Sequence, residues 1–189
     1  MWRYSVIGLA AALGLSACGA APTPAAKPPA VAEVTGPDTV SVGRYIVVTG
    51  GCNDCHTPGY APSGGKVPEA QWLTGNPVGY RGPWGTSYAS NLRLTVAGMP
   101  KEAFVTMLET RGGLPPMPWP SVHGLSAANK AALYDYIKSL GPGGERAPAN
   151  VPPGQEPKTP YENMIPVAPG GGPMPPPSGA RGPAGCEEC

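Results

Sequence analysis

Two stretches of the chain place apolar residues at helical spacing. The clearer one covers residues 125–140, with Ser126 as a plausible N-cap and Gly141-Pro142 as its stop. Its apolar stripe consists of Ala128, Ala132, Leu133, Tyr136, Ile137 and Leu140. This stripe predicts an amphipathic helix that packs one face against another element.

The second helical stretch covers residues 100–111. Pro100 suits the first helical position, and Gly112-Gly113 provides the stop. Its apolar residues at helical spacing are Ala103, Phe104, Met107 and Leu108. We interpret Met107 as a core residue and not as an iron ligand. A further apolar cluster at residues 45–48 is rich in β-branched side chains, and taken alone it favours a strand.

Much of the remaining chain shows no regular pattern. The sequence has 28 Gly and 28 Pro among 189 residues, a content typical of chains with long irregular segments. These residues gather in an Ala/Pro-rich stretch before residue 38, in residues 56–91 and after Pro142. We therefore expect the compact part of the protein to be small.

The most informative motif is Cys52-Asn53-Asp54-Cys55-His56. Cys-x-x-Cys-His is the attachment signature of c-type haem. If these residues form one helical turn, the two thiols share a face and can form thioethers with the two haem vinyl groups. His56 lies four residues after Cys52, so its ring can bind the iron of the same porphyrin. The motif predicts one covalent haem.

Two other chemistries use a Cys-x-x-Cys pair. A thioredoxin-type redox pair needs a βαβ context, and the sequence shows no such alternation. A zinc site needs two more Cys or His ligands at matching spacing. The only other histidine is His123, and the next cysteines are Cys186 and Cys189. We prefer haem, and a disulfide or thiol pair is the main alternative.

A second iron ligand is predicted in the proline-rich stretch after residue 113. Three prolines surround Met117 and prevent a continuous helix, so the thioether is held in a stiff loop. Met117 follows His56 by 61 residues, which is enough chain to reach the other face of the haem. Met99 is the second candidate, His123 is the third, and an open sixth position is the remaining alternative.

A bound haem also explains the irregular residues 56–91, because this chain can wrap the edge of the cofactor. Buried propionate groups need hydrogen-bond or charged partners. The candidate donors are Arg81, Trp84, Tyr88 and Asn91. For any one of them, aromatic packing or surface polarity is at least as good an explanation.

The N-terminus predicts export and lipid attachment. Residues 1–17 carry one cation, Arg3, and a short apolar run, which is typical of a secretory signal and too short for a spanning helix. Leu15-Ser16-Ala17-Cys18 resembles a bacterial lipobox, in which Cys18 is lipidated. The alternative is ordinary cleavage that leaves Cys18 free. Gly19 after the cysteine, in place of Asp, favours the outer membrane.

These patterns divide the chain into five parts. They are the signal (1–17), an Ala/Pro-rich tether (18–38), a haem domain (39–142), an extended segment that can pack on it (143–168) and a disordered tail (169–189). Without Arg3, the mature chain has 12 cations and 12 anions. This balance gives no basic stripe for nucleic acid.

Residues 41–141 resemble a monohaem class I cytochrome c domain, closest to the haem domains in the cytochrome subunits of membrane alcohol and aldehyde dehydrogenases. The matching segments are 51–58, 88–92 and 115–119. The resemblance implies thioethers at Cys52 and Cys55, His56 as proximal ligand and Met117 as distal ligand. Those subunits usually carry several haem motifs and this chain has one. Family members often read Asn-Leu-Thr-Pro-Asp where this chain has Asn91-Leu92-Arg93-Leu94-Thr95.

The resemblance further implies an all-α fold, with three main helices around one haem. It favours a helix over residues 40–49, crossed near Gly43 and Val47 by the helix at 125–140. The function it implies is electron transfer between redox proteins in the periplasm, with no enzymatic activity of its own. A haem enzyme or gas sensor with an open sixth site is the alternative.

The C-terminal Cys186-Glu187-Glu188-Cys189 lacks a following His, so it is not a second haem motif. In an oxidising compartment a local disulfide is the simplest interpretation. Capture of a soft metal ion by the two thiolates is the alternative.

Overall fold

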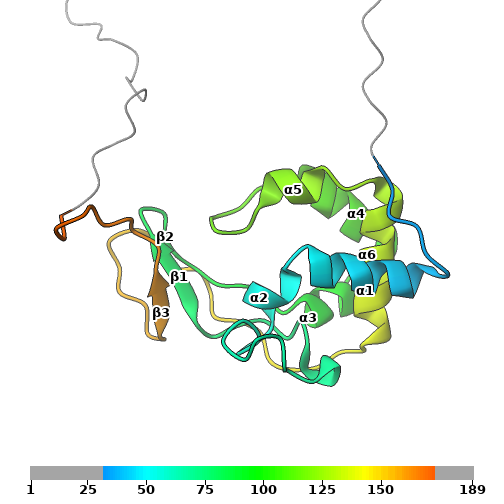
Figure 1. The fold of residues 1–189 in the computed structure, drawn as a ribbon, viewed down its shortest axis with the longest axis horizontal. Coiled ribbons are helices and arrows are strands. Elements are labelled where there is room, and N and C mark those ends of the chain that lie inside the picture. The colour runs from blue at the N-terminus through cyan, green and yellow to red at the C-terminus, as the bar shows by residue number, and fades with distance from the viewer. Residues whose placement is uncertain (1–31, 173–189) are drawn as a thin grey trace, which may run out of the picture. The chain divides into compact units, whose positions relative to one another are not determined.

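The computed structural model describes residues 32–172 (Figure 1). Its α-helices are α1 (Thr39–Thr49), α2 (Cys52–His56), α3 (Leu92–Ala97), α4 (Lys101–Thr110), α5 (Trp119–His123) and α6 (Ala127–Ser139). A 3-10 turn, η1, spans Glu69–Gln71. The strands are β1 (Gly79–Gly82), β2 (Gly85–Ser87) and β3 (Tyr161–Asn163). The three helices expected near residues 40–49, 100–111 and 125–140 are confirmed as α1, α4 and α6.

Helices α1 and α6 cross at the position predicted from the sequence. A Cβ atom added to Gly43 of α1 would lie 2.1 Å from the carbonyl oxygen of Ala132 in α6 and 2.7 Å from Cβ of Tyr136. No side chain fits in that space, so glycine allows the two backbones to approach. Val47, one turn further along α1, is fully buried in the core.

One hydrophobic core joins α1, α3, α4 and α6 with the loop that follows α2. Its buried members are Val42, Ile46, Val47, Trp72, Leu73, Val96, Phe104, Leu108, Ala132, Leu133, Tyr134, Tyr136 and Ile137. Met107 packs against this cluster, in agreement with its interpretation as core. Side-chain N-caps from Asp38, Asn91 and Ser126 fix the starts of α1, α3 and α6.

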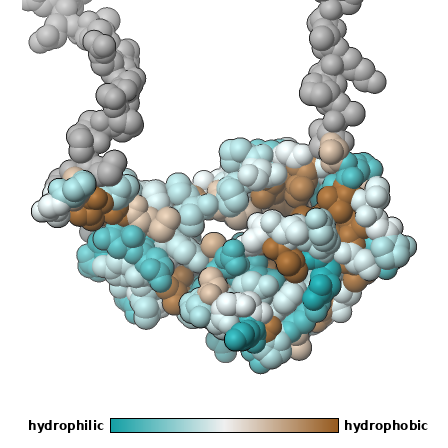
Figure 2. All heavy atoms as spheres, viewed as in Figure 1, coloured by the Kyte–Doolittle hydropathy of each residue, from teal (hydrophilic) through white to brown (hydrophobic). Residues whose placement is uncertain are grey.

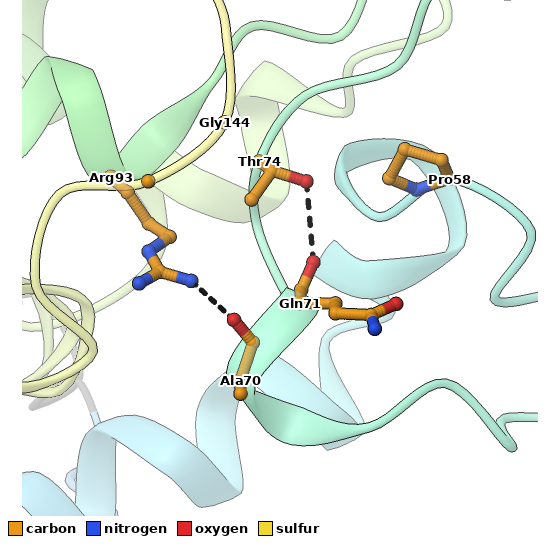
Figure 3. A pocket seen from close by; sticks show the side chains of 7 residues that line it. Pro58, Ala70, Gln71, Thr74, Arg93 and Gly144 are labelled. Atoms are coloured by element: carbon orange, nitrogen blue, oxygen red, sulfur yellow. Dashed lines mark hydrogen bonds between the residues drawn. The ribbon is translucent and has the colours of Figure 1, made fainter.

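Arg93 anchors the C-terminal end of α6. Its side chain is buried and donates from Nε to the Gly141 carbonyl at 2.6 Å, and also to the carbonyl of Leu140. Nη1 donates to the Ala70 carbonyl at 2.7 Å, a bond drawn in Figure 3. A cation suits the negative end of a helix dipole. Arg93 also lines an open surface hollow of about 370 Å³.

The described residues contain a small mixed sheet, so the prediction of an all-α fold with three main helices is wrong. β1 and β2 form an antiparallel hairpin in which Tyr80 pairs with Ser87 and Arg81 with Thr86. β3 adds to the other side of β1 in parallel, giving the order β2-β1-β3 (Figure 1). The strands are only three or four residues long. Such strands are too short to show the alternation by which a sequence reveals them.

The segment after residue 142 lies along this sheet. Val151 and Thr86 exchange two backbone hydrogen bonds, of 2.8 and 2.9 Å, and Glu156 forms an ion pair with Arg81. Apolar side chains remain exposed where β3 ends, at Met164, Ile165 and Val167 (Figure 2).

Several predictions concern residues outside the described range. They are the signal at 1–17, lipidation of Cys18, most of the tether, most of the tail and the pair Cys186 and Cys189. Within residues 32–172, no helix has the length and apolar character needed to cross a membrane.

Candidate functional site

Residues 52–56 form one helical turn, α2, which is the condition for the two thiols of the motif to share a face. Gly51 precedes it with φ +66°, a left-handed conformation that glycine adopts without strain. A single turn brings Cys52, Cys55 and His56 to adjacent positions on one short element. This is the geometry that two thioethers and one axial ligand of a shared porphyrin require.

His56 is held by a backbone carbonyl. Its ring is buried, and Nδ1 lies 2.7 Å from the carbonyl oxygen of Ser90. Because a carbonyl can only accept, Nδ1 carries the proton and Nε2 keeps its lone pair. Burial lowers the pKa of His56, although the hydrogen bond to Ser90 opposes this shift. The ring is therefore neutral, oriented and able to bind a metal ion through Nε2.

The loop between η1 and β1 positions the carbonyl of Ser90. Gly75 donates its N–H to the His56 carbonyl at 2.8 Å, and Asn76 donates to the carbonyl of Ala89 at 3.0 Å. These bonds tie the residues on both sides of the His56–Ser90 contact into one frame.

Cys52 and Cys55 are not joined by a disulfide in this structure, and each is partly buried. Burial, the largest cause, raises the pKa of Cys52 to about 11. This shift is opposite in direction to the lowered pKa of the cysteine thiolate that reacts in a thioredoxin-type pair. Within residues 32–172, no three His, Cys, Asp or Glu side chains gather into a group that could hold a metal ion.

A chain of buried polar groups supports α2, and no sequence motif marks it. The hydroxyl of Thr57 donates to Oδ1 of Asn53 at 2.7 Å and accepts from the N–H of Leu73 at 2.8 Å. Leu73 has φ +60° and is the one residue other than glycine with positive φ in the described range. Its carbonyl accepts the N–H of Leu92 at the start of α3. The two side chains that meet, Asn53 and Thr57, lie within or beside the motif, but the backbone N–H of Leu73 that joins them carries no side-chain signal in the sequence.

Met117 lies in the loop between α4 and α5 and is partly buried. Its carbonyl accepts the N–H of Trp119 at 2.9 Å. Its role as distal ligand stays a prediction. The runner-up Met99 packs against the hydrophobic core. His123 is exposed, and its Nε2 lies 2.9 Å from the carbonyl oxygen of Arg111, so this ring nitrogen already has a protein partner.

Three of the four candidate propionate donors already have protein partners. Arg81 pairs with Glu156, and the hydroxyl of Tyr88 lies 2.8 Å from that of Thr159. Asn91 uses Nδ2 to reach the carbonyls of Gly143 and Glu145, and Oδ1 to cap α3. Their contacts with propionates stay predictions.

Trp84 is different from those three. Its indole Nε1 is buried without a hydrogen-bond partner among the described residues, and so is Nε1 of Trp119, two residues after Met117. Buried N–H groups are seldom left unpaired in a folded protein. Nδ2 of Asn53 and the hydroxyl of Thr86 are also buried without a partner among the described residues. Of these four groups, the two indoles lie in the predicted propionate region and beside the predicted ligand loop, where a polar cofactor edge would give them a partner.

Comparisons with known proteins found no match among family models, curated proteins or solved structures. The functional assignment therefore depends on the chemistry of the residues described above.

Proposed function

We propose that this protein is a c-type cytochrome of the monohaem class I family that carries electrons. The observation that carries the proposal is the set of Cys52, Cys55 and His56 on one helical turn, with Nδ1 of His56 bonded to the Ser90 carbonyl. In haem and other metal proteins, a carbonyl partner of this kind fixes the ring and increases the basicity of the ligating nitrogen.

The residues present fit one covalent haem. Cys52 and Cys55 would supply the thioethers, and His56 and Met117 the axial ligands. Trp84 would offer its unpaired indole N–H to a propionate. When bound, the haem supplies the one-electron chemistry. The protein fixes the ligands, excludes water and sets the potential, and a methionine ligand raises that potential because a thioether favours iron(II).

Electron transfer is favoured over catalysis because Met117 would fill the sixth position. Its loop is stiff, with prolines at 115, 116 and 118, so the thioether has little freedom to move away. With His56 and Met117 both bound to the iron, no coordination position would be left for a substrate.

The proposal includes a place in the cell envelope. The signal-like residues 1–17 and lipobox cysteine Cys18 would attach the protein by lipid, facing the periplasm and favouring the outer membrane. Its partners would be a redox donor and a redox acceptor, such as a periplasmic dehydrogenase or a respiratory chain. The equal numbers of cations and anions in the mature chain argue against nucleic acid as a binding partner.

The test is an optical spectrum of the full-length protein, produced with haem-maturation machinery, in both oxidation states and after addition of carbon monoxide. We expect the weak long-wavelength band of methionine bound to iron(III), and no reaction with carbon monoxide. Met117→Ala should abolish the band and allow carbon monoxide to bind. Met99→Ala, at the runner-up position, is the matched control and should keep the wild-type spectrum.

A different result would redirect the assignment. If Met117→Ala kept the wild-type spectrum, Met117 would not be the ligand. If the wild-type protein lacked the band and bound carbon monoxide rapidly, the haem enzyme or gas sensor would replace the electron carrier.

A further inference from the structure

The loop that carries Met117 has few internal constraints from hydrogen bonding. Pro115, Pro116 and Pro118 have no N–H to donate. In the part of the chain that the structure describes, residues 112–116 take part in a single hydrogen bond. That bond is accepted by the carbonyl of Pro115, two residues before Met117.

The donor is the hydroxyl of Ser87, the last residue of β2. Ser87 is buried, with 7 % of its surface exposed. A second contact of the same hydroxyl, with the carbonyl of Tyr80, is long at 3.4 Å. The bond to Pro115 therefore joins the sheet to the loop of the predicted distal ligand.

Ser87 is itself held on both sides by the segment after residue 142. Its neighbour Thr86 exchanges two backbone hydrogen bonds with Val151. Its other neighbour, Tyr88, donates its N–H to Oδ1 of Asn150 at 3.0 Å. Two consecutive residues of the C-terminal segment thus fix the strand position from which Ser87 reaches the loop.

We propose that Ser87 is a positioning residue for Met117, and that Asn150 and Val151 act through it. The inference rests on the proposed His56/Met117 ligation and extends it. The sheet holds the Pro115 carbonyl, the carbonyl limits the movement of the loop, and the thioether stays at its target. The C-terminal segment thereby becomes part of the distal ligand's support.

The test uses imidazole as a competing ligand for oxidised, haem-loaded full-length protein. Imidazole binds the form in which the methionine has left the iron, so its apparent affinity reports the population of that form. A neutral hydrogen bond contributes about 1 kcal/mol, so Ser87→Ala should increase the apparent affinity roughly fivefold. Asn150→Ala should change it in the same direction.

Two variants serve as controls. Ser87→Thr keeps the hydroxyl and should keep wild-type imidazole affinity. Ser139→Ala removes a similar bond, from a hydroxyl to the Tyr136 carbonyl at 2.7 Å, at the end of α6. It should leave imidazole affinity unchanged. Haem content and far-ultraviolet circular dichroism verify that each variant is folded and loaded.

The outcomes separate this inference from the proposed function. If Ser87→Ala matched the wild-type protein, or if Ser139→Ala had an equal effect, the positioning role would be overturned. If the wild-type protein showed no methionine band, the ligand assignment itself would fail, and the role of Ser87 with it.

Discussion

Nδ1 of His56 lies 2.7 Å from the carbonyl oxygen of Ser90, a residue 34 positions later in the chain. This contact depends on a close approach between the two segments at Gly75. A Cβ atom added to Gly75 would lie 2.8 Å from the backbone nitrogen of Asn91, next to Ser90. The orientation of His56 therefore depends on a glycine that lies outside the Cys52–His56 motif.

Gly75→Ala should destabilise the protein and reduce its haem content. Gly75 has φ +84°, so alanine there costs about 1–2 kcal/mol in backbone strain, and the contact with Asn91 adds to this cost. The control is Gly59→Ala, because Gly59 has φ +72° but nothing within 4 Å of its Cβ position. Urea unfolding and the haem-to-protein absorbance ratio measure both effects. Equal losses in the two variants would mean that the frame around Ser90 is not important.

A second prediction concerns the crossing of α1 and α6. Gly43→Ala would push a methyl group against the Ala132 backbone, which cannot move aside as a side chain can. We expect a loss of about 2 kcal/mol or more in the free energy of unfolding. Gly98→Ala, whose Cβ would lie 3.5 Å from the Leu94 carbonyl, should change it by less than about 0.5 kcal/mol. Urea unfolding of both variants measures this difference. Similar midpoints for Gly43→Ala and Gly98→Ala would contradict the close crossing of α1 and α6.

A third prediction concerns Arg93, which donates to three backbone carbonyls at 70, 140 and 141. Arg93→Met should cost about 3 kcal/mol, because it removes the three hydrogen bonds that this charged and buried side chain donates. Arg93→Lys should recover only part of that loss, since an ammonium group lacks the planar fork of a guanidinium. Arg44→Met, which removes an exposed ion pair with Glu69, should cost less than about 1 kcal/mol. Denaturant midpoints that rank Arg44→Met as the more harmful change would contradict this account.

The helices were predictable because their signals are local. Residues 125–140 and 100–111 carry an apolar stripe, a start signal and a glycine stop within one short window. The Cys-x-x-Cys-His motif is also local, and its five residues do form the single helical turn that a shared haem would need. The crossing at Gly43 followed from the resemblance to cytochromes c.

The sheet and the supports of the site were not predictable in the same way. β3 pairs with β1 across about 80 residues, and Tyr161 to Asn163 are all exposed, so no apolar pattern marks the strand. Ser90 and Pro115 act through their carbonyl groups, which every residue has. A pattern of side chains therefore cannot show that His56 contacts the carbonyl of Ser90, or that Ser87 contacts the carbonyl of Pro115.

A fourth prediction concerns acid stability. The hydrogen bond from Arg44, followed by that from Tyr136, lowers the pKa of Glu69 below its ordinary value of 4.5, although burial opposes the shift. A carboxyl group with a lower pKa in the folded state stabilises the fold above its unfolded pKa, and this contribution is lost as the pH falls.

The wild-type protein should therefore lose more unfolding free energy than Glu69→Gln when the pH falls from about 6 to 3. The difference should be below about 1 kcal/mol, because the Arg44–Glu69 pair is exposed and screened by solvent. Glu102→Gln is a suitable control, since Glu102 forms no ion pair within residues 32–172. Parallel pH profiles for the wild-type protein and Glu69→Gln would exclude this linkage.

The most direct test of the central claim is the intact mass, under denaturing conditions, of the full-length protein made with haem-maturation machinery. The account predicts the mass of one haem, retained after denaturation because Cys52 and Cys55 hold it by thioethers. Cys52→Ser or Cys55→Ser should leave one bond, and the double variant should release the haem. A wild-type protein that carries no covalent haem would contradict the account.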